Sequence, residues 1–116
     1  MRILITAASL LLLSLGASSA RAHAFLNHAS PLVGSTVSAP PQEVLLTFTQ
    51  NLEGAFSTVQ VTGPNGARVD QGKQVSGNTM RVGIKASVAG TNHVHWRALS
   101  VDTHTTEGNF TFHVGR

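Results

Sequence analysis

Residues 109–114 have the sequence NFTFHV, in which Phe110, Phe112 and Val114 alternate with polar residues. Successive side chains of a β-strand point to opposite faces, so this alternation predicts a strand with one buried face. Similar runs are rich in β-branched and aromatic residues and lack helical periodicity; they occur at residues 43–49, 56–62, 79–84 and 93–99. The sequence therefore predicts at least five short strands.

Clusters of turn-forming residues separate these strands, at residues 40–41, 63–66, 76–78 and 89–90. Short strands at such intervals are typical of sandwiches and barrels, so we predict an all-β fold, a β-sandwich. Asn65-Gly66 is a favoured hairpin dipeptide in which both residues adopt positive φ. It predicts that residues 56–61 pair with the short segment that follows them.

The first 22 residues are typical of a secretory signal peptide. Arg2 precedes an almost wholly apolar run, residues 3–15, and a small-residue region ends in Ala20-Arg21-Ala22, an A-x-A cleavage site. About a dozen apolar residues are too few for a membrane-spanning helix, which needs roughly 20. We therefore predict a signal peptide at residues 1–22 and one exported domain at residues 23–116 that does not itself span the membrane.

Composition limits the function classes. Loss of Arg2 and Arg21 with the leader lowers the formal net charge from +3 to +1, and no cluster of Lys or Arg remains, so nucleic acid is not an expected partner. The chain has no cysteine, and its methionines are Met1 and Met80. Soft sulfur ligands are therefore scarce, and a metal held here should prefer nitrogen and oxygen.

Three residues form a candidate metal site. Cleavage after Ala22 makes His23 the first residue, and its α-amine and ring then offer two nitrogens in one chelate. Asp102 and His104 are separated by one residue, and in extended backbone this spacing points both side chains to the same face. Three nitrogens and one carboxylate oxygen suit the tetragonal coordination of Cu(II), with zinc as the competitor.

Plainer interpretations of the same residues stay open. Asp102 and His104 are also compatible with a solvated polar turn, and His23 with a frayed terminus. Cleavage after Ala20 would create Arg21-Ala22-His23, which binds Cu(II) or Ni(II) through backbone amides, and cleavage after Ala24 would delete the site. Three further histidines lie on the polar faces of predicted strands and should face solvent: His93, His95 and His113. The alternative is that they form a weak second metal site or a surface that assists metal transfer.

Two stretches of the mature chain resemble the CopC family of periplasmic copper-binding proteins. The later stretch, residues 94–104 with the sequence VHWRALSVDTH, is the more specific, and it continues through Gly108, Phe110 and Phe112. The earlier stretch comprises His23-Ala24-Phe25-Leu26, Ser30-Pro31, Gly34 and residues 41–48. The resemblance implies a Greek-key sandwich or barrel that is immunoglobulin-like or cupredoxin-like, a periplasmic location, and Cu(II) ligands at His23, Asp102 and His104.

The chain departs from the family pattern at several positions. A methionine- and histidine-rich Cu(I) loop has no counterpart between Val69 and Met80, so the chain resembles a Cu(II)-only member. Gln50 stands where similar members often carry an acidic residue near the copper, with Glu53 three residues on; the sequence leaves open whether either lies near the metal. Thr105 stands where a proline is common.

These observations favour a non-enzymatic Cu(II) carrier or buffer in copper resistance or homeostasis. The resemblance implies an inner-membrane copper transporter of the CopD type as its partner. One alternative is an oxidative enzyme with a histidine brace, although the chain lacks tyrosine and Asp102 would occupy a position that oxygen chemistry prefers open. Another is a β-sandwich interaction module whose histidines are incidental.

Overall fold

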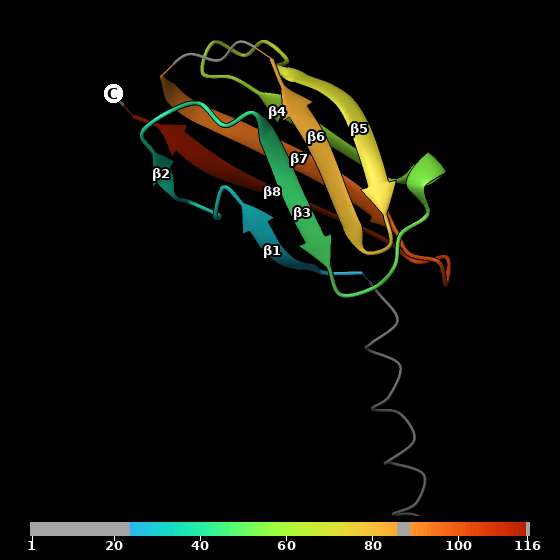
Figure 1. Ribbon diagram of the computed structural model, residues 1–116. Coiled ribbons are helices and arrows are strands. Elements are labelled where there is room, and N and C mark those ends of the chain that lie inside the picture. The colour runs from blue at the N-terminus through green and yellow to red at the C-terminus, as the bar shows by residue number, and fades with distance from the viewer. Residues whose placement is uncertain (1–23, 86–88, 116) are drawn as a thin grey trace, which may run out of the picture.

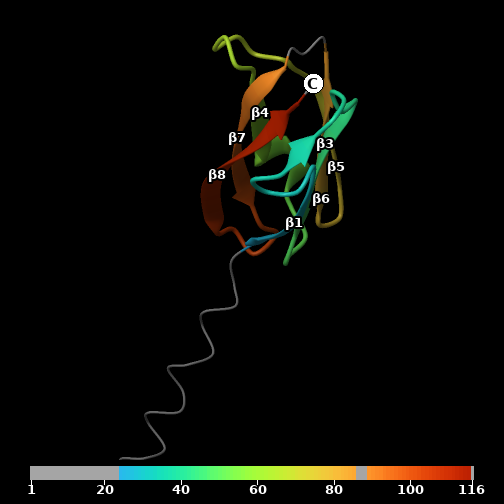
Figure 2. The ribbon, with the colours of Figure 1, turned by 90° about the vertical axis from the view of Figure 1, so that its left-hand side faces the viewer.

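The computed structural model describes residues 24–85 and 89–115, which form eight strands and one short 3₁₀ helix in two facing sheets (Figures 1 and 2). The predicted signal peptide and His23 lie outside the described residues. The elements are β1 (Leu26–Ser30), β2 (Thr36–Val37), β3 (Glu43–Phe48), η4 (Gly54–Phe56), β4 (Thr58–Thr62), β5 (Asp70–Ser76), β6 (Thr79–Ile84), β7 (Gly90–Leu99) and β8 (Thr105–Val114).

The chain crosses repeatedly between the two sheets. One sheet has the order β1-β3-β6-β5 and the other the order β2-β8-β7-β4. The short strand β2 runs parallel to β8, and the other named pairs are antiparallel. The predicted all-β Greek-key sandwich is therefore confirmed. Among the residues that the structure describes, no helix is long and apolar enough to cross a membrane.

The core lies between the sheets and is built by the alternating residues of the central strands. Phe48 of β3 and Trp96 of β7 meet edge to face across it, with ring centroids 5.0 Å apart. Trp96 is thus a core residue, as its place on the apolar side of its strand suggests. Gly108 of β8 lies opposite Trp96, where a Cβ atom would come within 2.5 Å of the indole ring. Only glycine fits there without movement of that ring.

The predicted hairpin after β4 is wrong in most of its detail. Residues 54–56 form η4, so β4 begins at Thr58, and its partner along the whole strand is β7. The following segment meets the end of β4 through the bridge between Thr62 and Arg68 and through hydrogen bonds of Val61 with Val69 (2.9 Å) and Asp70 (2.8 Å). It then enters the other sheet as β5. Gly66 has a φ of 85°, whereas Asn65 has no positive φ. Burial of alternate β4 residues between the sheets outweighs the local turn preference.

Candidate metal centre

A tight loop joins β7 to β8 at one end of the sandwich and carries two of the predicted ligands. The backbone N–H of Ser100 donates to the carbonyl oxygen of His104 at 3.0 Å, and the N–H of Thr103 donates to the carbonyl of Ser100 at 2.9 Å. Thr103 has a φ of 74°, a left-handed conformation that a β-branched residue rarely adopts. The loop therefore reverses the chain through an unfavourable backbone conformation at the residue between Asp102 and His104.

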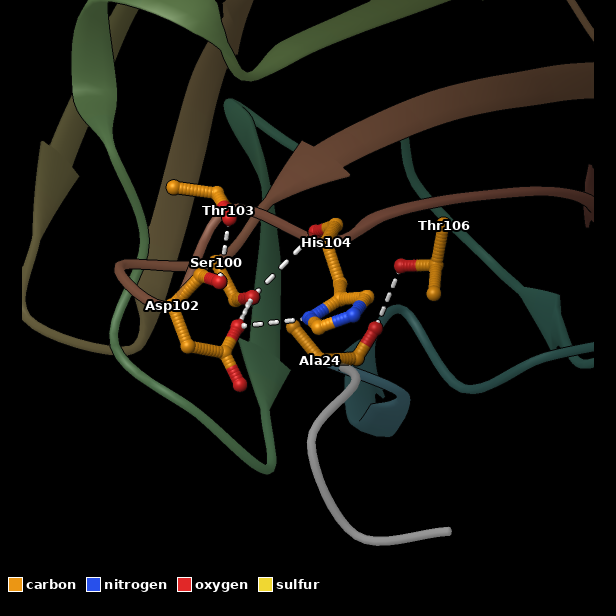
Figure 3. Close-up of polar contacts among 6 residues, drawn as sticks. All are labelled: Ala24, Ser100, Asp102, Thr103, His104 and Thr106. Carbon is orange, nitrogen blue, oxygen red and sulfur yellow. Dashed lines mark hydrogen bonds and ion pairs between the residues drawn. The ribbon is translucent and has the colours of Figure 1, made fainter. Parts of the chain in front are cut away.

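The loop brings the side chains of Asp102 and His104 together (Figure 3). Oδ1 of Asp102 lies 3.5 Å from Nδ1 of His104, and the two side chains are 41% and 49% exposed. The prediction that both side chains lie on one face of an extended segment is wrong, because Thr103 between them is left-handed. A turn, rather than strand alternation, produces the juxtaposition. The pair faces solvent and can meet a metal ion without any opening of the core.

Ser100 contacts the pair from the buried side of the loop. Its side chain is fully buried, and its hydroxyl donates a hydrogen bond to Oδ1 of Asp102 (Figure 3). This hydroxyl, and to a smaller extent the His104 side chain, lowers the pKa of Asp102 below its ordinary value. The carboxylate is therefore ionised at neutral pH and suited to bind a cation.

The first described residues lie beside this loop. Ala24 is fully buried, and its carbonyl oxygen accepts a hydrogen bond from the hydroxyl of Thr106, two residues beyond His104 (Figure 3). Phe25 exchanges hydrogen bonds with Thr49, both of 2.9 Å: its N–H donates to the threonine hydroxyl, and its carbonyl accepts from the threonine N–H. The residue that follows His23 in the sequence is thus fixed next to the Asp102–His104 loop.

A third segment completes this end of the molecule. The N–H of Val101 donates to the carbonyl of Asn51 at 3.1 Å, and the N–H of Glu53 donates to the carbonyl of Leu99 at 2.8 Å. The stretch that holds Gln50 and Glu53 therefore runs along the base of the loop. Within residues 24–85 and 89–115, however, no group of three or more His, Asp or Glu side chains could hold a metal ion. Glu53 does not join Asp102 and His104 as a third ligand.

The outer face of the second sheet carries the other predicted histidines. His93 and His113 are exposed, and His95 is partly exposed, so the prediction that they face solvent is confirmed. The ring of His95 contacts Oε2 of Glu107 through Nε2 at 2.9 Å and Oδ1 of Asn109 through Nδ1 at 2.8 Å. Both nitrogens already have partners, and these histidines form no metal cluster among the described residues.

The fold and this loop define a class: a small β-sandwich with an exposed Asp–His pair, suited to metal ligation, at one end. A CopC domain matches residues 26–115, so the chain belongs to the CopC family. The family predicted from the sequence is thereby confirmed.

Individual relatives agree with this assignment. The chain is 34% identical over 113 residues to Protein YobA of Escherichia coli (strain K12), covering 93% of this chain and 91% of the relative. It is 34% identical over 110 residues to Copper resistance protein C of Escherichia coli, covering 84% and 86%. The crystal structure of CopC from Methylosinus trichosporium OB3b matches with a TM-score of 0.75 and 30% identity, over 80% of this chain and 94% of that chain.

Proposed function

We propose that this protein binds Cu(II) through His23, Asp102 and His104 and acts as a periplasmic copper carrier or buffer in copper resistance or homeostasis. Membership of the CopC family, with a relative named Copper resistance protein C, supports a copper-related function. The observation that carries the proposal is the exposed Asp102–His104 pair beside the anchored Ala24.

The neighbourhood of Ala24 supports His23 as the further ligand. Residue 23 is covalently bonded to Ala24, and Ala24 is hydrogen-bonded to Thr106 at the base of the loop. Asp102 and His104 alone supply two donors, fewer than a stable metal site uses. A histidine at the mature N-terminus would add an amine and an imidazole nitrogen, giving the three-nitrogen, one-oxygen set that suits Cu(II).

The chemistry of the available donors favours Cu(II) over Cu(I). The chain has no cysteine, and Met80 is fully buried in the core. Soft thiolate and thioether ligands, which select Cu(I), are therefore absent from the described surface of the sandwich, whereas imidazole and carboxylate groups are present. We infer a carrier without catalysis, which delivers copper to an inner-membrane transporter of the CopD type.

The test is the mass of the protein exported from its own leader, measured under gentle ionisation with and without one equivalent of Cu(II). We expect a chain that begins at His23 and retains one copper ion. The matched variants are His23→Ala and His28→Ala, because His28 lies on β1 with an exposed side chain. Copper should be lost from the first variant and kept by the second. Equal copper retention by both variants would contradict the proposal.

A further inference from the structure

Ser100 differs from the other residues of the candidate centre because it is fully buried yet hydrogen-bonded to an exposed side chain. It pairs with Leu52 at the end of β7, and its hydroxyl oxygen also lies 3.2 Å from the carbonyl oxygen of His104. A serine hydroxyl has one proton to donate, and of its two acceptors the ionised Asp102 carboxylate is the nearer and the stronger. The rigid core is thus connected directly to a predicted metal ligand.

The two oxygens of Asp102 have different surroundings. Both Ser100 Oγ and His104 Nδ1 approach Oδ1. In the close-up the second carboxylate oxygen points away from both groups (Figure 3). One oxygen is therefore used to fix the orientation of the carboxylate, and the other is turned outward.

We propose that Ser100 is a positioning residue that holds the Asp102 carboxylate in its metal-binding orientation before the metal arrives. This inference rests on the proposed function, because it assigns a role toward the same Cu(II) site. The hydrogen bond from the N–H of Thr103 to the carbonyl of Ser100 closes the turn around the backbone of Asp102, and the Ser100 hydroxyl fixes the Asp102 side chain. Without the hydroxyl, an exposed aspartate samples several rotamers, and the metal must then order it at the time of binding.

The magnitude follows from other metal proteins, in which loss of a group that hydrogen-bonds a ligand weakens metal affinity by about 10-fold to 100-fold. Asp102 keeps its second contact, with His104, so we expect the lower end of this range for Ser100→Ala. The variant removes one oxygen and introduces no bulk, so the core packing should persist.

Ser57 provides a matched control. It is also fully buried, and its hydroxyl oxygen accepts a hydrogen bond from the N–H of Leu99 at 3.0 Å, next to Ser100 in the chain. Ser57→Ala thus removes a buried hydroxyl from the same end of β7 without contact with Asp102. Any effect of general loosening at this end should appear in both alanine variants.

The experiment measures Cu(II) affinity of the exported, processed protein by competition with a chelator of known affinity, together with the melting temperature of each metal-free variant. The set comprises wild type, Ser100→Ala, Ser57→Ala, Asp102→Ala, the double variant Ser100→Ala/Asp102→Ala, and Ser100→Thr. We expect about 10-fold weaker binding for Ser100→Ala, wild-type affinity for Ser57→Ala and affinity near the wild-type value for Ser100→Thr, which keeps the hydroxyl. In the double variant, loss of the hydroxyl should add nothing to loss of the carboxylate.

The outcomes separate the two proposals. If Asp102→Ala weakens binding while Ser100→Ala binds as wild type does, the role of Ser100 is overturned and the copper site stands. The role of Ser100 is also overturned if Ser100→Ala weakens Cu(II) binding as much in the Asp102→Ala background as it does in wild type. The serine would then act independently of the Asp102 carboxylate. Should Asp102→Ala itself bind Cu(II) as tightly as wild type, the proposed function fails first.

Discussion

The chain contains two aspartates, and the structure uses them in opposite ways. Asp70 has a side chain only 10% exposed, and both of its oxygens lie 2.7 Å from the guanidinium of Arg68. It also accepts a hydrogen bond of 2.8 Å from the N–H of Val61. Asp102 is 41% exposed, and its side chain contacts the Ser100 hydroxyl and the His104 ring. The Asp70 carboxylate is neutralised by arginine and stabilises the contact between neighbouring strands. The Asp102 carboxylate contacts a hydroxyl and an imidazole, so its negative charge can still attract a metal cation.

The two turns near these aspartates differ in the energetic cost of their left-handed residue. Near Asp70 the left-handed position is filled by Gly66, which adopts positive φ at little cost. Next to Asp102 the left-handed residue is Thr103, for which the conformation costs about 1–2 kcal/mol. Such strain persists only where surrounding contacts determine the backbone, and it is frequent at functional sites. The turn made of ordinary turn residues serves the fold, and the strained loop presents the predicted ligands.

The largest difference between substitutions at Asp70 and at Asp102 should be in the affinity for Cu(II). Asp102→Ala removes a direct ligand of the proposed site, so we expect at least about 100-fold weaker Cu(II) binding, the upper end of what loss of a ligand's hydrogen-bond partner costs. Asp70→Ala should bind Cu(II) as wild type does. Competition titration against a chelator measures both, and comparable losses in the two variants would remove the distinction between the regions.

The opposite ranking should hold for stability. Asp70→Ala leaves the N–H of Val61 without its partner and Arg68 without its counter-ion, so the free energy of unfolding should fall by about 2 kcal/mol. Asp102→Ala removes one acceptor of the buried Ser100 hydroxyl, but the carbonyl oxygen of His104 lies 3.2 Å from that hydroxyl and can accept its proton instead. The free energy of unfolding should therefore fall much less. Urea unfolding of the metal-free proteins provides the measurement. If Asp102→Ala lowered the free energy of unfolding more than Asp70→Ala, the loop that carries Asp102 would contribute more to stability than the Asp70 region, against this prediction.

Acid unfolding should depend mainly on Asp70. The hydrogen bonds from Arg68 hold the pKa of Asp70 below its ordinary value of 3.8. A carboxyl group whose pKa is lower in the folded state stabilises the fold fully above its unfolded pKa, and this contribution is lost as the pH falls through the folded pKa. We expect wild-type stability to decline from about pH 5 downward and Asp70→Asn to show a shallower decline. Melting temperatures between pH 7 and the acid transition would test this, and parallel curves would refute it.

The smallest effects should come from Gly66 and Thr103, the left-handed residues of the two turns compared above. A Cβ atom at Gly66 would meet no other atom within 4 Å, but the backbone conformation itself opposes alanine. Gly66→Ala should therefore cost about 1 kcal/mol. Thr103→Gly relieves strain and adds freedom to the unfolded chain, so the two terms should nearly cancel. Thermal unfolding compares the variants, and a large destabilisation by Thr103→Gly would show that its side chain matters more than its backbone.

The predictable part of the fold is the part with alternating burial. β3, β6, β7 and β8 carry strong apolar alternation, and the sequence located each of them. The missed strands β1, β2 and β5 contain few buried side chains; β5, with the sequence DQGKQVS, has none. Such strands are stabilised mainly by backbone hydrogen bonds to a neighbour, which leave no periodic signal in the sequence. Hydrophobic patterning alone therefore could not find them.

The sequence predicted that Asp102 and His104 lie close together but not the geometry that brings them together. The spacing of Asp102 and His104 brought them to attention, yet their proximity depends on the left-handed Thr103, which no sequence rule assigns to a threonine. Ser100 gave no signal because a serine at a strand end is common, and its role emerges only from its burial and its bond to Asp102. The ligation of copper by His23, Asp102 and His104 stays a prediction for the experiments above.

The hydrogen bond from Thr106 to Ala24 also has a kinetic consequence, because it joins residues 82 positions apart in the chain. The β7–β8 hairpin is local and can bring Asp102 and His104 together early in folding, whereas contacts across long sequence separations pay a larger loop-closure entropy and form slowly. Ala24 reaches the loop only after the first and last strands have met at the same end of the sandwich. A nascent chain emerging N-terminus first would therefore lack this neighbourhood until its final strand had been made.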